Sequence, residues 1–299
     1  PVDKLNRETE QFSASSGRAS YTETEKGITV KANGRTFVFS KKDGQLKDVS
    51  VNNRKISFAN GPRFIGARRA DRSLDQFYNH DDEKAKAKDR TYSEFTDAAV
   101  FTKLDVKEEG GNLILTANYK LGNLDKAQWT IHPDGMATLD YTYNFSGVVD
   151  LMGICFDYPE EQVLSKRWLG AGPYRVWQNR IHGTQYDVWE NDYNDPIPGE
   201  TFTYPEFKGY FGDVSWMNIQ TKEGTISLTN ETPDAYIGVY QPRDGRDRLL
   251  YTLPESGISV LNVIPPVRNK VNSTDLCGPS SQPKWVNGPQ TGRVIFRFM

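Results

Sequence analysis

The sequence predicts an all-β protein built as a large two-sheet antiparallel sandwich. Short runs in which apolar and polar residues alternate recur along most of the 299 residues, and turn residues such as Asp-Gly separate several of them. No helical periodicity extends convincingly over three turns, and aromatic residues, which favour strands, make up 12% of the chain. Because open sheets rarely exceed about ten strands, so many short strands must close into a barrel or pack as two sheets.

The strands are expected to begin near Tyr21, after a polar, serine-rich segment over residues 1–20 that is typical of a linker or a disordered lead-in. The clearest hairpin joins residues 127–132 to 136–143 through Pro133-Asp134-Gly135, because Asp-Gly between two alternating runs is a strong hairpin signal. Other strands are expected at 27–31, 36–40, 46–51, 99–107, 112–120, 150–157, 212–220, 224–230, 235–240, 257–264 and 292–298. One large sandwich domain over residues 21–299 follows from this pattern.

Two stretches interrupt the alternation, at 60–95 and at 184–211. The first contains the charged run 81–89, which cannot bury apolar surface and is expected to be a solvated loop. The second is rich in aromatic residues, Asn, Asp and Pro, and a long ordered loop in a compact domain is more often functional than filler.

Charge and composition favour neutral partners. The formal net charge is −2 with a pI near 6.0, and basic and acidic residues are interspersed, so the sequence predicts no nucleic-acid or membrane partner. No apolar stretch reaches the 18 residues that a spanning helix needs. The two cysteines, Cys155 and Cys277, are too few for a disulfide framework, and Cys155 lies in an apolar run where a small buried side chain is expected.

The sequence assigns no catalytic residue. His80, His132 and His182 occur in no triad-like context. Carboxylates crowd the stretch 184–211, but side chains in such Asn/Asp-rich loops more often cap turns. No pattern typical of a transition-metal site is present, and no cofactor is required, although a calcium ion held by loop oxygens stays open.

The segment 168–183, followed by 204–210, is the densest in potential binding residues. Arg175, Asn179 and Arg180 supply planar hydrogen-bond donors beside a sharp Gly-Pro bend. One interpretation is a buried polar network that ties the bend to neighbouring strands. The other is a sugar subsite, in which Arg, Asn and carboxylates bind vicinal hydroxyls and an aromatic ring receives the sugar face.

Leu169-Gly-Ala-Gly-Pro-Tyr-Arg-Val-Trp-Gln-Asn-Arg180 resembles the Gly-x-Gly-Pro-x-x-x-Tyr-x-Asp-Arg signature of the small-chain domain of β-galactosidases in glycoside hydrolase family 2, with Trp177 in the Tyr place and Asn179 in the Asp place. Looser similarities follow in the family's order: residues 60–64 upstream, 204–216 after the signature, and 275–285 before the last strands.

The resemblance covers roughly residues 25–299 and implies a galactose mutarotase-like sandwich at the C-terminus of a multidomain hydrolase. In that family the catalytic glutamates lie on a separate (β/α)8 barrel, so this chain alone is expected to be inactive and to be a piece of a longer protein. Its partners would be that barrel, the other domains of the parent chain, and a glycan or galactoside. The family's location further implies a periplasmic or extracellular protein.

The substrate-binding residues implied by the resemblance and by the dense segment are Trp285, Arg175, Trp177, Asn179, Arg180, Tyr204 and Glu206. Trp285 takes the place of a tryptophan that lines the family's active-site pocket, but Gly-Pro-Ser-Ser-Gln-Pro precedes it as an insertion, and a core or interface role stays open.

Three functions remain to be separated. The first is the hydrolase accessory domain. The second is an autonomous carbohydrate-binding module, which needs an open aromatic platform, from Trp177, Trp189, Tyr193 and Tyr204. The third is an aldose 1-epimerase-like enzyme, which needs a general acid and a general base facing one cleft.

Overall fold

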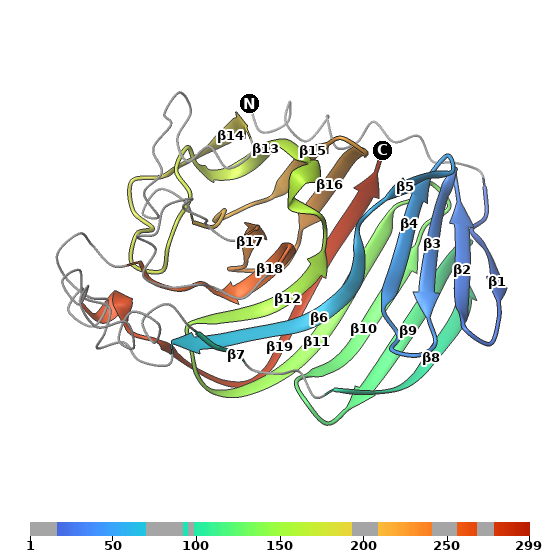
Figure 1. Ribbon diagram of the computed structural model, residues 1–299, viewed down its shortest axis with the longest axis horizontal. Coiled ribbons are helices and arrows are strands. Elements are labelled where there is room, and N and C mark those ends of the chain that lie inside the picture. The colour runs from blue at the N-terminus through green and yellow to red at the C-terminus, as the bar shows by residue number, and fades with distance from the viewer. Residues whose placement is uncertain (1–16, 70–91, 95–98, 193–208, 241–255, 268–277) are drawn as a thin grey trace.

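A computed structural model describes residues 17–69, 92–94, 99–192, 209–240, 256–267 and 278–299. Its strands form two sheets, and every ladder between named strands is antiparallel. The ten-stranded sheet has the order β1-β2-β3-β4-β6-β12-β18-β17, with β5 beside β4 and β7 beside β6. The nine-stranded sheet has the order β14-β13-β15-β16-β19-β11-β10-β9-β8. Figure 1 shows β1–β4 lying over β8–β10.

The ten-stranded sheet consists of β1 (Ser20–Glu23), β2 (Gly27–Ala32), β3 (Arg35–Ser40), β4 (Leu46–Val51), β5 (Arg54–Ile56), β6 (Ala59–Arg69), β7 (Tyr92–Glu94), β12 (Leu151–Asp157), β17 (Tyr236–Val239) and β18 (Ile258–Val263). The nine-stranded sheet consists of β8 (Val100–Glu109), β9 (Asn112–Lys120), β10 (Leu124–Ile131), β11 (Ala137–Val149), β13 (Val163–Gly172), β14 (Gln185–Asp192), β15 (Trp216–Thr221), β16 (Gly224–Asn230) and β19 (Lys284–Phe298). The helical turns η1 (Glu160–Gln162) and η4 (Pro279–Ser281) have three residues each.

The predicted hairpins are confirmed. In β10 and β11, Ile131 pairs with Ala137 across the Pro133-Asp134-Gly135 turn, and the Asp134 carboxylate accepts a hydrogen bond of 2.9 Å from the Met136 amide. Strands β3 and β4 likewise pair around Asp43-Gly44.

The main core lies between the two sheets. The inward residues of the alternating strands meet there, so that Phe39 of β3 lies 6.0 Å from Trp129 of β10, measured between ring centroids. Phe58, Phe156 and Phe296 form an aromatic cluster with centroid separations of 4.6 to 5.4 Å. Ring pairs at such separations contribute more than their buried area alone.

A second, smaller core covers the opposite face of the ten-stranded sheet. Residues of β6, β12 and β18 that point away from the main core pack there against Val176, Trp177 and Tyr210. Strand β12 is therefore buried on both faces over Leu151–Phe156, and its Cys155 is 3% exposed, as the apolar run around it predicts. We call residues 173–180 and 209–212 the outer layer.

Two expected interruptions of the strand pattern are partly wrong. Residues 59–69 form β6, which is buried on both faces over residues 64–67 and contains Gly61, Pro62 and Gly66, so its sequence shows no alternation. Residues 185–192 form the edge strand β14, whose mostly exposed side chains include several polar residues. The charged run 81–89 lies outside the described residues.

Candidate functional site

The signature segment, residues 169–180, continues from β13 into the outer layer. At Gly172 a Cβ would overlap the indole ring of Trp189 on β14, which explains why only glycine fits this close approach. Beyond the bend, Val176 exchanges two backbone hydrogen bonds with Tyr210, of 2.7 and 2.9 Å. Trp177 is completely buried against the second core.

Arg175 is also buried, with 5% of its surface exposed. Its guanidinium carbon lies 5.9 Å from the centroid of the Phe211 ring, and Nζ of the buried Lys166 lies at the same distance from that centroid. A desolvated cation over an aromatic ring is attracted by the ring quadrupole. Arg175 and Trp177 therefore contribute to packing, and neither presents an open surface to a ligand.

Gln178 and Asn179 tie the outer layer to two other segments. The Asn179 amide donates to the Val267 carbonyl (2.7 Å) and to Ser281 Oγ (2.8 Å), and its oxygen accepts from the Val267 amide (2.9 Å). The Gln178 amide donates to the carbonyls of Ser280 and Gln282, at 2.8 and 2.7 Å. These bonds fix η4 and the start of β19 beside the signature segment.

Arg180 and Trp285 are the predicted residues that the structure exposes. Arg180 closes a tight turn with Trp177 through backbone hydrogen bonds, and its side chain is exposed. Trp285 is 72% exposed on β19, where it pairs with Val148 of β11. We call the surface around Ile181, η4 and Trp285 the η4 end of the sandwich. Tyr204 and Glu206 lie outside the described residues.

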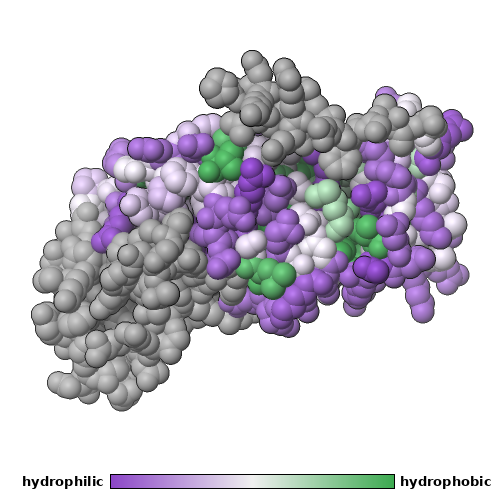
Figure 2. All heavy atoms as spheres, turned by 90° about the horizontal axis from the view of Figure 1, so that it is seen from above, coloured by the Kyte–Doolittle hydropathy of each residue, from purple (hydrophilic) through white to green (hydrophobic). Residues whose placement is uncertain are grey.

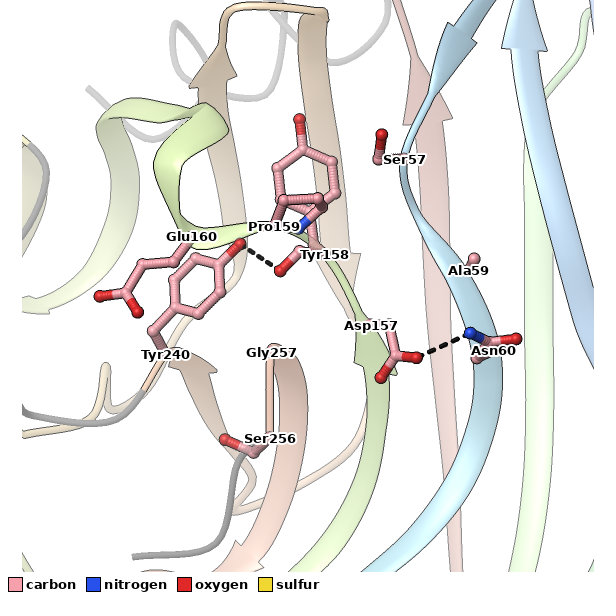
Figure 3. A pocket seen from close by; sticks show the side chains of 10 residues that line it. All are labelled: Ser57, Ala59, Asn60, Asp157, Tyr158, Pro159, Glu160, Tyr240, Ser256 and Gly257. Carbon is pink, nitrogen blue, oxygen red and sulfur yellow. Dashed lines mark hydrogen bonds between the residues drawn. The ribbon is translucent and has the colours of Figure 1, made fainter. Parts of the chain in front are cut away.

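Sequence reasoning missed a polar pocket at the C-terminal end of β12, where Asp157 lies. The pocket has a volume of about 490 Å³ and is shown in Figure 3. Its lining residues come from the chain before and at the start of β6, the end of β12, and the chain around η1, β17 and β18: Ser57, Ala59, Asn60, Asp157, Tyr158, Pro159, Glu160, Tyr240, Ser256 and Gly257. Because Asn60 and Asp157 are far apart in the sequence, no local spacing could have indicated this pocket.

Asp157 is held in a fixed position on the pocket wall. Its carboxylate accepts hydrogen bonds from Arg63 Nη2 (2.6 Å) and from the Asn60 amide (2.7 Å). Burial by itself raises the pKa of the Asp157 carboxyl, but the hydrogen bonds from Arg63 and Asn60, with the charges of Arg63 and Lys47, hold that pKa below its usual value. Asp157 is therefore ionised at neutral pH.

The histidines that the structure describes show no catalytic pairing. His132 lies at the β10–β11 turn with Nε2 2.9 Å from Thr138 Oγ1, and burial lowers its pKa despite the charge of Asp134. His182 is exposed, and His80 lies outside the described residues. Within the described part of the chain, no three His, Cys, Asp or Glu side chains are placed to hold a metal, and no helix is long and apolar enough to cross a membrane.

The fold is that of the galactose mutarotase-like β-sandwiches, as the family resemblance implies. Galactose 1-epimerase from Lactobacillus acidophilus NCFM matches with a TM-score of 0.51 and 8% identity, covering 95% of this chain and 99% of that chain. Also similar is a galactose mutarotase-like protein from Lactobacillus casei ATCC 334, with a TM-score of 0.41 and 10% identity, covering 94% of this chain and 100% of that chain. No curated protein sequence matches the chain.

The sequence itself defines the family more narrowly than the fold does. The family model of the beta galactosidase small chain matches residues 31–267. The chain therefore belongs to the β-galactosidase small-chain family, and the resemblance carried by the signature segment is confirmed.

Proposed function

We propose that this chain is a non-catalytic β-sandwich domain of a β-galactosidase-like glycoside hydrolase, which packs against the catalytic (β/α)8 barrel and lines the glycan pocket with Trp285. The family match over residues 31–267 supports the parent activity. The observation that carries the proposal is the contrast between the buried Arg175 and Trp177 and the exposed indole of Trp285. A chain located outside the cytoplasm, in the periplasm or beyond the cell, fits a hydrolase of external glycans.

The η4 end supplies a reason for the exposure of Trp285. The signature segment anchors η4 through Gln178 and Asn179, and η4 ends three residues before β19 begins. This anchoring fixes the chain just ahead of Trp285, which reduces the conformational entropy lost when an aromatic ring stacks on a sugar. In this proposal Asn179 is a positioning residue. Ile181, 39% exposed, adds apolar surface for a neighbouring domain.

The first test is activity of the purified chain. We expect no hydrolysis of a chromogenic galactoside, because the family's catalytic glutamates belong to another domain. We expect no catalysis of galactose mutarotation measured by polarimetry, because, of the two described histidines, His132 contacts Thr138 at a turn and His182 is exposed. Hydrolysis or mutarotation by the purified wild-type chain would refute the non-catalytic role and favour an enzyme.

The second test is binding of galactose and galactosides by isothermal titration. Trp285→Ala should weaken binding roughly fivefold, because stacking on an aromatic ring contributes about 1 kcal/mol. Leu121→Ala is the matched control, since Leu121 is 73% exposed and lies outside the η4 end. If the two variants bind with equal affinity, Trp285 does not line the glycan pocket. If that affinity also equals that of the wild-type chain, an autonomous carbohydrate-binding surface elsewhere is favoured.

A further inference from the structure

The pocket at the far end of β12 is separate from the η4 end. Trp285 pairs with Val148, three residues before β12 begins, whereas Asp157 is the last residue of β12. Six steps along a strand of about 3.3 Å each place the two ends of β12 about 20 Å apart. A single small sugar therefore cannot contact both Trp285 and this pocket.

The pocket presents preorganised polar groups. Arg63 donates to the Asn60 carbonyl as well as to Asp157, both at 2.6 Å, and Lys47 donates to the Asn60 side-chain oxygen at 3.1 Å. These bonds hold the carboxylate and the amide in one arrangement before any ligand arrives, which lowers the entropic cost of binding. Half of the Asp157 side chain is still exposed, so its oxygens can accept further hydrogen bonds.

Ser256 adds a second indication of a ligand. It is 4% exposed and lines the pocket, and within the part of the chain that the structure describes its hydroxyl makes no hydrogen bond. A serine hydroxyl that lines a pocket and has no partner among the described residues can donate to or accept from a ligand hydroxyl. Figure 3 shows Asn60 and Asp157 on one side of the pocket and Glu160 with the ring of Tyr240 on the other.

The charges favour a neutral ligand. The carboxylate of Asp157 lines the pocket and disfavours an anion, while Arg63, 2.6 Å from it, compensates its charge and reduces the attraction for a cation. The Tyr240 hydroxyl donates to the Tyr158 carbonyl at 2.7 Å, which fixes its ring. Carboxylate, amide and hydroxyl groups beside a fixed aromatic ring suit a polyhydroxyl compound.

We propose that the pocket formed by Asn60, Asp157, Glu160, Tyr240 and Ser256 is a second carbohydrate site, which binds a neutral sugar of monosaccharide to disaccharide size. Its volume of about 490 Å³ lies within the range of small-ligand sites. This site does not depend on the proposed role of Trp285.

The test uses saturation-transfer NMR on the 299-residue chain carrying Trp285→Ala, which removes the other proposed sugar contact. D-Galactose, D-glucose and lactose are the neutral probes, and choline is the cationic probe. Asn60→Gly removes the amide without backbone strain, because Asn60 has a φ of 52°, which glycine adopts freely. Ser256→Ala removes the unpaired hydroxyl. Asn53→Gly is the matched control, since Asn53 has a φ of 65° and lies outside the pocket.

We expect at least one neutral probe to bind the Trp285→Ala chain. Asn60→Gly and Ser256→Ala should each raise its Kd at least about threefold, because one neutral hydrogen bond is lost, while Asn53→Gly leaves the Kd unchanged. No saturation transfer to any sugar, an equal Kd in all variants, or binding of choline alone would each overturn the proposal. The proposal of a second site would also be overturned if the wild-type chain binds a sugar and Trp285→Ala alone abolishes that binding. This result would support the role of Trp285.

Discussion

Replacing Asn179 by alanine tests whether the signature segment is a structural clamp. The change removes three hydrogen bonds, of 2.7, 2.8 and 2.9 Å, two of which satisfy the backbone of Val267. Val267 is 1% exposed, so water has poor access to its carbonyl and amide. Each buried group left without a partner costs about 1–3 kcal/mol. Because Asn179 itself is half-buried, water takes over part of the hydrogen bonding that its amide provides, which reduces this cost. We expect Asn179→Ala to lower the free energy of unfolding by about 2–4 kcal/mol.

Urea denaturation followed by tryptophan fluorescence measures this loss. Asn287→Ala is the control, because Asn287 is exposed and its side chain accepts one hydrogen bond, of 2.9 Å, from Ser146. Its cost should stay within about 0.5 kcal/mol, as for most surface changes. Equal destabilisation by the two variants would refute the clamp.

Asn179→Asp sharpens the same test, since aspartate takes this place in the family signature. Aspartate can still accept from the Val267 amide, but an ionised carboxylate cannot donate to the Val267 carbonyl. The variant should therefore be destabilised at neutral pH and recover part of its stability below about pH 4, where a protonated carboxyl can donate. A pH-independent difference from the wild type would contradict this account.

Three further predictions concern the glycine bend and two titrating groups. Gly172→Ala should destabilise the fold strongly, because its Cβ would overlap the Trp189 indole; an unchanged urea midpoint would contradict the close packing. The pKa of the Asp157 carboxyl is lowered in the fold, so near that pKa the native state binds fewer protons than the unfolded state. The contribution of Asp157 to stability is therefore present above about pH 4 and declines as the pH falls. Asp157→Asn should flatten this part of the profile of stability against pH. Burial raises the pKa of the Tyr141 hydroxyl to about 12, so the native state holds this proton between about pH 10 and 12 while the unfolded state loses it. The free energy of unfolding should therefore fall as the pH rises through that window. In Tyr141→Phe this loss should be smaller when unfolding is measured at each pH.

The alternating strands and their turns were predictable because one face of each is buried and the other is not. Strands β10 and β11 follow this rule, with Trp129, Leu139 and Tyr141 inward and polar residues between them. Strand β6 does not, because its other face is covered by the outer layer. Strand β14 was not predicted because edge strands can be polar on both faces.

The signature was recognisable in the sequence, but the environment of its side chains was not. A run such as Arg175-Val-Trp-Gln-Asn179 fits both a sugar subsite and a buried network. Only the packing of Val176 and Trp177 on the outer face of the ten-stranded sheet separates these interpretations. The pocket around Asp157 was invisible for a different reason, since its walls meet only when β6, β12 and β18 are brought together.

The position of β19 constrains the order in which the protein can fold. This strand, residues 284–298, lies between β11 and β16 and joins two groups of strands that otherwise share no ladder, β8–β11 and β13–β16. During synthesis both groups emerge from the ribosome before the strand that unites them, so each exposes an unpaired edge for that interval. Such edges favour aggregation, and the late, long-range pairing favours slow folding. Production of the protein should therefore depend strongly on temperature and on chaperones that shield exposed strand edges.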